Sequence, residues 1–196
     1  MTATLRRRQV VAILLQERKD LLLVAGLGST AWDITAAGDS PLSFPLWGAM
    51  GNAAMIGLGL ALAQPARRVL VITGDGEMLM GLGSLATIGV QQPRNLSVVV
   101  IDNERYGETG MQATHTASGV ELAKVALACG FGSARQVRES GELGSLREAI
   151  HGAPGPHFAQ VKVVAEKLPL VLPPRDGGVL KSRFRKALLG EGADLD

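Results

Sequence analysis

The stretch Val69-Leu70-Val71-Ile72-Thr73-Gly74-Asp75-Gly76 decides the fold, because an apolar run rich in β-branched residues opens directly into an aspartate between two glycines. A second apolar run, Ser97–Asp102, ends at Asn103, and twenty-six residues separate Gly76 from Asn103. Both runs are apolar at consecutive positions, which predicts buried parallel strands. Asp75 and Asn103 then lie at the same edge of a sheet. Their oxygen atoms, beside backbone amides exposed by glycine, suit Mg²⁺ that holds a phosphorylated cofactor.

Strand-like and helix-like segments alternate along the rest of the chain. Strands are expected at 21–25, 69–73, 97–102, 133–137 and 158–164, and helices at an N-terminal amphipathic segment, 49–64, 80–90, 121–129 and 142–151. This alternation predicts an α/β fold, a doubly wound, mainly parallel sheet with helices on both faces. Residues 41–47, with two prolines, are expected to be irregular. We expect one domain over 1–196, with a C-terminal arm from about 173 that lies outside the core.

Composition limits the classes of function. Apolar residues make up 46% of the 196 residues and aromatic residues 4%, so the core is expected to consist of aliphatic side chains. The net charge of +2 is too small to predict a nucleic-acid partner. We interpret the basic runs, 6–8 and 175–186, as solvated surface.

Cysteine content and hydropathy indicate the compartment. Cys129 is the single cysteine, which fits a reducing compartment, and it is expected to serve packing. The apolar stretch 10–15 follows three arginines, as in a secretion signal, but the polar run 16–20 interrupts it. Continuous apolar segments do not reach the ~20 residues that a membrane span needs. The sequence therefore predicts a cytoplasmic protein that does not cross a membrane.

The spacing of Gly74-Asp75-Gly76 and Asn103 resembles the signature of enzymes that use thiamine diphosphate (thiamine pyrophosphate, TPP), in which Gly-Asp-Gly precedes Asn by about two dozen residues. The resemblance implies TPP and Mg²⁺ as cofactors. It also implies the metal ligands: the side chains of Asp75 and Asn103, and the backbone carbonyl of Arg105. A purely structural alternative for the tripeptide is a strand-to-helix turn with Asp75 as the helix cap.

The resemblance also implies how TPP would be held. Gly48 would bind the aminopyrimidine through its carbonyl, and Met50 would hold the two rings in a V shape. On spacing alone, a methionine that opens an apolar helix would be a core residue. The full set of implied cofactor-binding residues is Gly28, Ser29, Gly48, Met50, Gly74, Asp75, Gly76, Glu77, Asn103, Tyr106 and Gly107.

One motif and two residues leave alternatives open. Gly26-x-Gly28-x-x-Ala31 is a weak dinucleotide fingerprint, but it requires an acidic residue at the end of a second strand, and we expect no strand around 44–46. Glu77 stands where many relatives carry a small residue, so its carboxylate must turn away from a diphosphate or bind a cation. His115 is the candidate catalytic residue of this chain, through contact with an anionic substrate or a proton relay. Otherwise it is an ordinary loop residue.

Longer strings narrow the resemblance. Residues 50–63, 83–88 and 106–114 are similar to the diphosphate-binding portion of sulfopyruvate decarboxylases (their β subunit) and phosphonopyruvate decarboxylases, and the similarity covers about residues 20–190. Many of these relatives carry proline where this chain has Ala113. The resemblance implies the diphosphate-binding subunit of a heteromeric decarboxylase that acts on a small anionic 2-oxo acid.

The same resemblance implies a partner. The glutamate that activates TPP belongs to a pyrimidine-binding domain, and no part of this chain is left to form one, so a partner subunit would complete the site. Three other functions stay open: a carboligase similar to acetolactate synthase, a subunit of a 2-oxo-acid oxidoreductase, and a non-catalytic regulatory subunit that binds the cofactor.

Overall fold

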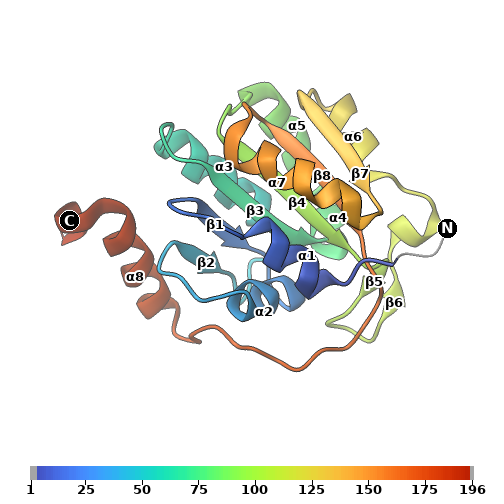
Figure 1. Ribbon diagram of the computed structural model, residues 1–196, viewed down its shortest axis with the longest axis horizontal. Coiled ribbons are helices and arrows are strands. Elements are labelled where there is room, and N and C mark those ends of the chain that lie inside the picture. Colours follow the sequence, from blue (N-terminus) through green and yellow to red (C-terminus); the bar gives the residue numbers. More distant parts are fainter. Residues whose placement is uncertain (1–3, 195–196) are drawn as a thin grey trace.

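The computed structural model describes residues 4–194, in which a six-stranded parallel sheet lies between two layers of helices (Figure 1). The strands of this sheet are β1 (Leu22–Ala25), β2 (Ser43–Pro45), β3 (Val69–Gly74), β4 (Leu96–Asp102), β7 (Ser133–Val137) and β8 (His157–Lys162). The α-helices are α1 (Arg7–Leu14), α2 (Ser29–Ala36), α3 (Ala53–Ala63), α4 (Asp75–Met80), α5 (Ser84–Gln91), α6 (Leu122–Ala128), α7 (Leu143–Gly152) and α8 (Gly177–Leu189). A small antiparallel pair, β5 (Arg105–Tyr106) and β6 (Gln112–Ala113), and the 3-10 turns η1 (His115–Ser118), η2 (Ser140–Glu142) and η3 (Gly190–Asp194) complete the description.

The strand order is β2-β1-β3-β4-β8-β7, and every neighbouring pair is parallel. From β1 the chain moves outward to β2, returns to β3 on the other side of β1, and then continues to β4. The order of the strands therefore reverses between β1 and β3. In open α/β sheets a crevice for ligands forms beyond the carboxyl ends of the strands at such a reversal. The predicted doubly wound, mainly parallel fold is confirmed.

Alternate residues of each strand pack into opposite layers, as the period of an extended chain requires. In β3, Val69 and Val71 join the core beneath α3, α5 and α6, whereas Leu70 and Ile72 join the core beneath α1, α2 and α7. Close packing depends locally on glycine, since a Cβ on Gly57 would lie 2.1 Å from a methyl group of Val71.

Two helices begin at other residues than predicted. The expected helix 49–64 starts at Ala53, because Ala49 and Gly51 have φ angles of 58° and 88°, which an α-helix does not contain. The expected helix 80–90 is two helices. Directly after β3, α4 begins at Asp75, and a turn over 81–83 separates it from α5.

The prediction of an irregular segment around 44–46 was wrong, because Ser43–Pro45 forms the edge strand β2 beside β1. Proline is tolerated at the edge of a sheet, where its missing N–H leaves no ladder position unsatisfied. The arm that follows residue 173 carries α8, whose first N–H groups bond to the side chain of Asp176. This helix returns to the sheet at β2, where the ring centroids of Phe184 and Phe44 lie 5.5 Å apart. The expectation that the arm lies outside the core is therefore wrong for Phe184, which is a buried member of the core cluster.

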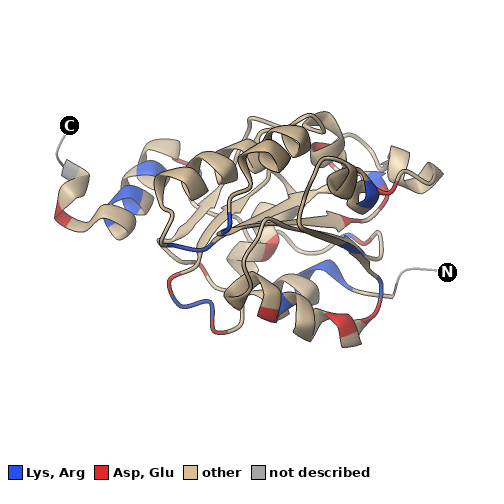
Figure 2. Cartoon of the chain, turned by 90° about the horizontal axis from the view of Figure 1, so that it is seen from above, with Lys and Arg blue, Asp and Glu red and all other residues tan. Residues whose placement is uncertain are grey.

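Basic residues follow one another along α8 (Figure 2), at Lys181, Arg183, Arg185 and Lys186. They are exposed or half-buried, which agrees with the interpretation of this run as solvated surface. Among residues 4–194, none of the helices combines the length and the apolar character that a membrane-spanning helix needs.

Candidate functional site

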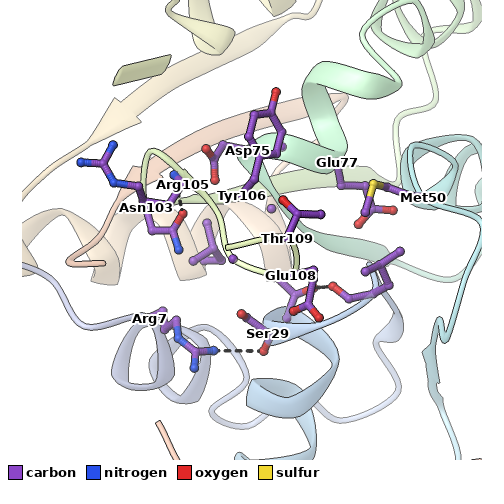
Figure 3. Close-up of a pocket in the computed structure, with 16 residues that line it drawn as sticks. Arg7, Ser29, Met50, Asp75, Glu77, Asn103, Arg105, Tyr106, Glu108 and Thr109 are labelled. Carbon is purple, nitrogen blue, oxygen red and sulfur yellow. Dashed lines mark hydrogen bonds between the residues drawn. The ribbon is translucent and has the colours of Figure 1, made fainter. Parts of the chain in front are cut away.

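A pocket of about 130 Å³ lies beyond the carboxyl ends of β1, β3 and β4, at the place where the strand order reverses. Residues of five separate segments form its wall, and Figure 3 shows how their side chains converge. The lining residues are Arg7, Leu27, Ser29, Thr30, Met50, Gly74, Asp75, Gly76, Glu77, Ile101, Asn103, Arg105, Tyr106, Gly107, Glu108 and Thr109. Ten of the residues implied at the sequence level are in this set: Ser29, Met50, Gly74, Asp75, Gly76, Glu77, Asn103, Arg105, Tyr106 and Gly107.

The structure brings Asp75 and Asn103 together, as their positions after two neighbouring strands predict. The carboxylate of Asp75 is only 2% exposed, and its Oδ2 accepts a hydrogen bond of 2.6 Å from the hydroxyl of Thr114. The backbone N–H of Asn103 also donates to this carboxylate. The side-chain Oδ1 of Asn103 accepts from the backbone N–H of Arg105 at 2.9 Å, which fixes the turn after β4.

Burial, and after it the nearby charge of Asp102, raise the pKa of Asp75 to about 6, against the lowering effect of the bond from Thr114. A buried carboxylate without a cation is electrostatically unfavourable, and a bound divalent cation would remove that cost. Among residues 4–194, no group of three or more His, Cys, Asp or Glu side chains is placed so that it could hold a metal ion. A metal here therefore needs the amide of Asn103 and backbone oxygen in addition to one carboxylate.

The raised pKa of Asp75 predicts a pH-dependent stability of the unliganded chain. The carboxyl is protonated in both the folded and the unfolded state below its ordinary pKa of 3.8, and it is ionised in both above about 6. Stability from this group is thus fully present below pH 3.8 and is lost as the pH rises through 6. Urea unfolding at pH 4, 5, 6 and 7 should show the wild type losing stability relative to Asp75→Asn over this window. A constant difference across the four values would contradict the prediction.

The side chain of Glu77 is buried instead of reaching into open solvent. Its Oε2 accepts a hydrogen bond of 2.9 Å from the hydroxyl of Thr73, and a Cβ on Gly26 would lie 1.8 Å from the same oxygen. Glycine at 26 is therefore required by the position of this carboxylate. Burial raises the pKa of Glu77, while hydrogen bonds from the hydroxyl of Thr73 and from nearby backbone N–H groups lower it.

Because residue 76 is a glycine, an aromatic ring can pack directly over the first turn of α4. A Cβ at this position would lie 2.6 Å from the ring of Tyr106, so the ring rests directly on the backbone. At the start of α2, Gly28 has a φ angle of 73°, and the carboxylate of Glu108 packs against it. The loop after β4 thus covers the turns that follow β1 and β3.

Three residues implied at the sequence level lie outside the set that lines the pocket: Gly28, Gly48 and His115. Gly28 directly precedes Ser29, which does line it, and Gly48 is exposed before the turn that leads into α3. His115 is exposed at the start of η1, with its Nδ1 3.4 Å from the hydroxyl of Tyr106. It borders the site through Tyr106, and its catalytic role stays a prediction.

Six pocket residues were not among the site residues implied by the sequence: Arg7, Leu27, Thr30, Ile101, Glu108 and Thr109. The interpretation of residues 6–8 as solvated surface is wrong for Arg7, which is 3% exposed. A signal existed, since Arg7, Val10, Val11 and Leu14 recur at helical spacing and form the buried face of α1.

The surroundings of Asp102 indicate a structural role. Its Oδ2 pairs with Nζ of Lys162 at 2.9 Å, and its Oδ1 accepts from the hydroxyl of Thr116 at 2.8 Å. Lys162 also pairs with Glu104 at 2.5 Å, just beyond Asn103. This network holds the end of β4 and the start of the loop in place.

Residues 29–161 match the family model described as thiamine pyrophosphate enzyme, C-terminal TPP binding domain. The chain belongs to this family. The matched range begins at the first residue of α2 and ends within β8, so it leaves out β1 but contains β3, β4 and most of the pocket.

Some relatives of this TPP-binding domain are subunits of similar length, and others are longer chains. The chain is 38% identical to the beta subunit of sulfopyruvate decarboxylase from Methanothermobacter thermautotrophicus over 176 residues, which cover 90% of this chain and 91% of the relative. It is 43% identical to phosphonopyruvate decarboxylase from Streptomyces hygroscopicus over 131 residues, which cover 67% of this chain and 31% of that protein.

A solved structure has the same fold as this chain. The benzoylformate decarboxylase of Polynucleobacter necessarius matches 85% of this chain and 34% of its own, with a TM-score of 0.70 at 21% identity. At this level of identity the match supports the fold alone.

Proposed function

We propose that this chain is the TPP- and Mg²⁺-binding subunit of a heteromeric decarboxylase that acts on a small 2-oxo acid with a second anionic group. The observation that carries this proposal is the similarity to a beta subunit of sulfopyruvate decarboxylase along nine tenths of both chains. In this proposal residues 1–196 act as one TPP-binding domain in the cytoplasm, with an arm from about 173.

The donor atoms at the sheet edge fit a magnesium ion. Asp75 offers a buried carboxylate whose pKa is raised by burial and by the nearby charge of Asp102. With the side-chain oxygen of Asn103 and the backbone carbonyl of Arg105, it makes a set of hard oxygen ligands, which Mg²⁺ prefers. His115 is not needed for this set and remains the candidate for contact with substrate.

The two ends of the pocket have different chemistry. Toward the start of α2, Ser29 and the adjoining Gly28 offer backbone N–H groups to a diphosphate, and Gly76 does so at α4. Tyr106 and Gly107 close the diphosphate end from the loop after β4. At the other end, Met50 gives an apolar wall, and Gly48 precedes it (Figure 3).

Bound TPP would supply the electron sink that decarboxylation of a 2-oxo acid requires. The residues of this chain would bind and orient it and exclude water. The pocket glutamates do not provide an obvious activating group. The carboxylate of Glu77 is held by Thr73 against Gly26, and that of Glu108 packs against Gly28 at the diphosphate end. This supports an activating glutamate on a partner subunit.

Exposed methionines support a partner that covers the Met50 end of the pocket. Met50 and Met55 are each 37% exposed and Met80 is 67% exposed. The turn at Gly51 brings two of them together, since a Cβ there would lie 3.2 Å from the side chain of Met80. Apolar side chains gathered beside an open pocket are typical of an interface.

Reconstitution tests the function directly. The full chain would be purified with and without the product of the neighbouring gene that encodes a pyrimidine-binding chain, and supplied with TPP, Mg²⁺, and sulfopyruvate, phosphonopyruvate or pyruvate in turn. We expect CO₂ and an aldehyde only from the assembled complex, and preferentially from an acid with two anionic groups. A ligated product would indicate a carboligase, and inactivity of a complex with bound TPP would indicate a regulatory subunit.

A further inference from the structure

A buried arginine lines the pocket and has no part in the site proposed so far. Arg7 is the first residue of α1, is 3% exposed, and lies beside Ser29 at the start of α2 (Figure 3). Full burial of an arginine is rare unless charges or hydrogen bonds compensate it. Its partners therefore indicate what the guanidinium does.

Within residues 4–194, both hydrogen bonds of the Arg7 side chain use Nη1. This nitrogen donates to Oδ2 of Asp33 at 2.5 Å and to the backbone carbonyl of Ser29 at 3.2 Å. These two bonds fix the guanidinium to α2 and leave the N–H groups on Nη2 and Nε for other acceptors. An arginine presents five such donors in a rigid plane, which suits a group with several oxygens.

The charges around Asp33 do not balance. Its Oδ1 accepts from Nε of Arg8 at 3.1 Å, so one buried carboxylate faces two guanidinium groups. The cluster of Arg7, Arg8 and Asp33 thus carries a surplus positive charge at the pocket wall. Arg8 also donates to the carbonyl of Pro169 and does not line the pocket, which leaves Arg7 as the member that faces it.

The backbone beside Arg7 favours the same kind of ligand. The first N–H groups of α2 have no acceptor within the helix, and they lie at the positive end of the helix dipole. The carboxylate of Glu108 already packs against Gly28 at this end. A bound phosphate or sulfonate group would displace this carboxylate from the donors next to Ser29.

We infer that Arg7 and the start of α2 form an oxyanion subsite that takes a phosphate or sulfonate group. This inference rests on the proposed function, which provides two sources for such a group: the terminal phosphate of TPP and the second acid group of the substrate. The position beside Ser29, at the diphosphate end, favours TPP.

The test compares Arg7→Gln with Arg8→Gln in the full chain. Both variants remove one arginine from Asp33, but only the first removes a pocket residue. Isothermal titration at saturating Mg²⁺ would measure the binding of TPP and of thiamine without phosphate. We expect Arg7→Gln to weaken TPP binding by about 10-fold to 100-fold, since hydrogen bonds to charged groups are of that strength. Thiamine binding should change little, and Arg8→Gln should stay near the wild type for both.

A second arm identifies the source of the oxyanion. If Arg7→Gln leaves TPP affinity unchanged but weakens binding of sulfopyruvate to the reconstituted complex, the subsite serves the substrate. Unchanged affinity for both TPP and sulfopyruvate would overturn the inference, and so would an equal loss for TPP and thiamine, which indicates a structural effect. Failure of the wild-type reconstituted complex to bind TPP would instead contradict the proposed function.

A double variant covers the case in which Arg7→Gln does not fold. Asp33→Asn with Arg7→Gln removes both charges of the pair, so no carboxylate is left buried without its partner. Its reference is Asp33→Asn alone. A weaker binding of TPP relative to this reference, with thiamine unaffected, supports the subsite, and equal TPP binding overturns it.

Discussion

Asp75→Asn is expected to lower the Mg²⁺-dependent affinity for TPP by about 100-fold or more, because it removes the one carboxylate among the three proposed metal ligands. Magnesium demands near-ideal octahedral geometry, and without Asp75 the proposed ligand set would contain no negative charge to offset that of the ion. The measurement is isothermal titration of TPP into the full chain with Mg²⁺ and with EDTA. In the wild type EDTA should weaken binding strongly, and in the variant it should make little difference.

The same substitution should not harm the unliganded chain. An asparagine keeps the size of the side chain and an oxygen for the bond from Thr114, and it removes a buried charge whose pKa is already raised by burial and by Asp102. We therefore expect a melting temperature at least equal to that of the wild type without ligand. Glu104→Gln is the control for charge, since it lies one residue from Asn103 and is not a proposed ligand. Full Mg²⁺-dependent binding by Asp75→Asn would refute the metal site.

Lys162→Met is expected to have the largest effect on stability, a loss of about 3–5 kcal/mol. Asp102 is fully buried and pairs with Lys162 at 2.9 Å, so the substitution leaves a carboxylate in the core without its cation. Hydrogen bonds from Thr116 and from Gln160, the latter at 2.7 Å, remain but carry no charge. For a chain of this length the loss corresponds to a melting temperature lower by roughly 6–20 °C.

Glu104→Gln is the matched variant for this prediction too. It removes the other partner of Lys162, but the side chain of Glu104 is 41% exposed, and exposed pairs contribute only about 0–1 kcal/mol. Urea unfolding of the two variants and the wild type would measure both effects. A loss below about 1 kcal/mol in Lys162→Met would show that Asp102 is adequately solvated by its hydrogen bonds alone.

The sheet edge of the site could be predicted because its determinants are local. The strands that end at Asp75 and Asn103 are continuous apolar runs, and parallel strands place such ends together. Family resemblance then extended the prediction to Met50 and Tyr106, both of which line the pocket. Gly48 was equally implied, but it lies outside the lining.

The missed elements depend on contacts between distant residues. The edge strand at Ser43–Pro45 is short and contains proline, and only its pairing with β1 makes it a strand. Arg7 belongs to a run of three arginines, which is usually solvated, and its burial depends on Asp33, twenty-six residues away. Periodicity along one segment does not reveal a partner of this kind.

The short edge strand beside α8 restricts how this chain can associate. Unpaired strand edges invite another polypeptide to add a strand, but β2 has three residues, ends in proline, and lies against Phe184. Continuous intermolecular sheets are thereby disfavoured on this side. Recognition of another polypeptide there would have to use the side chains of α8 and not the main chain of the sheet.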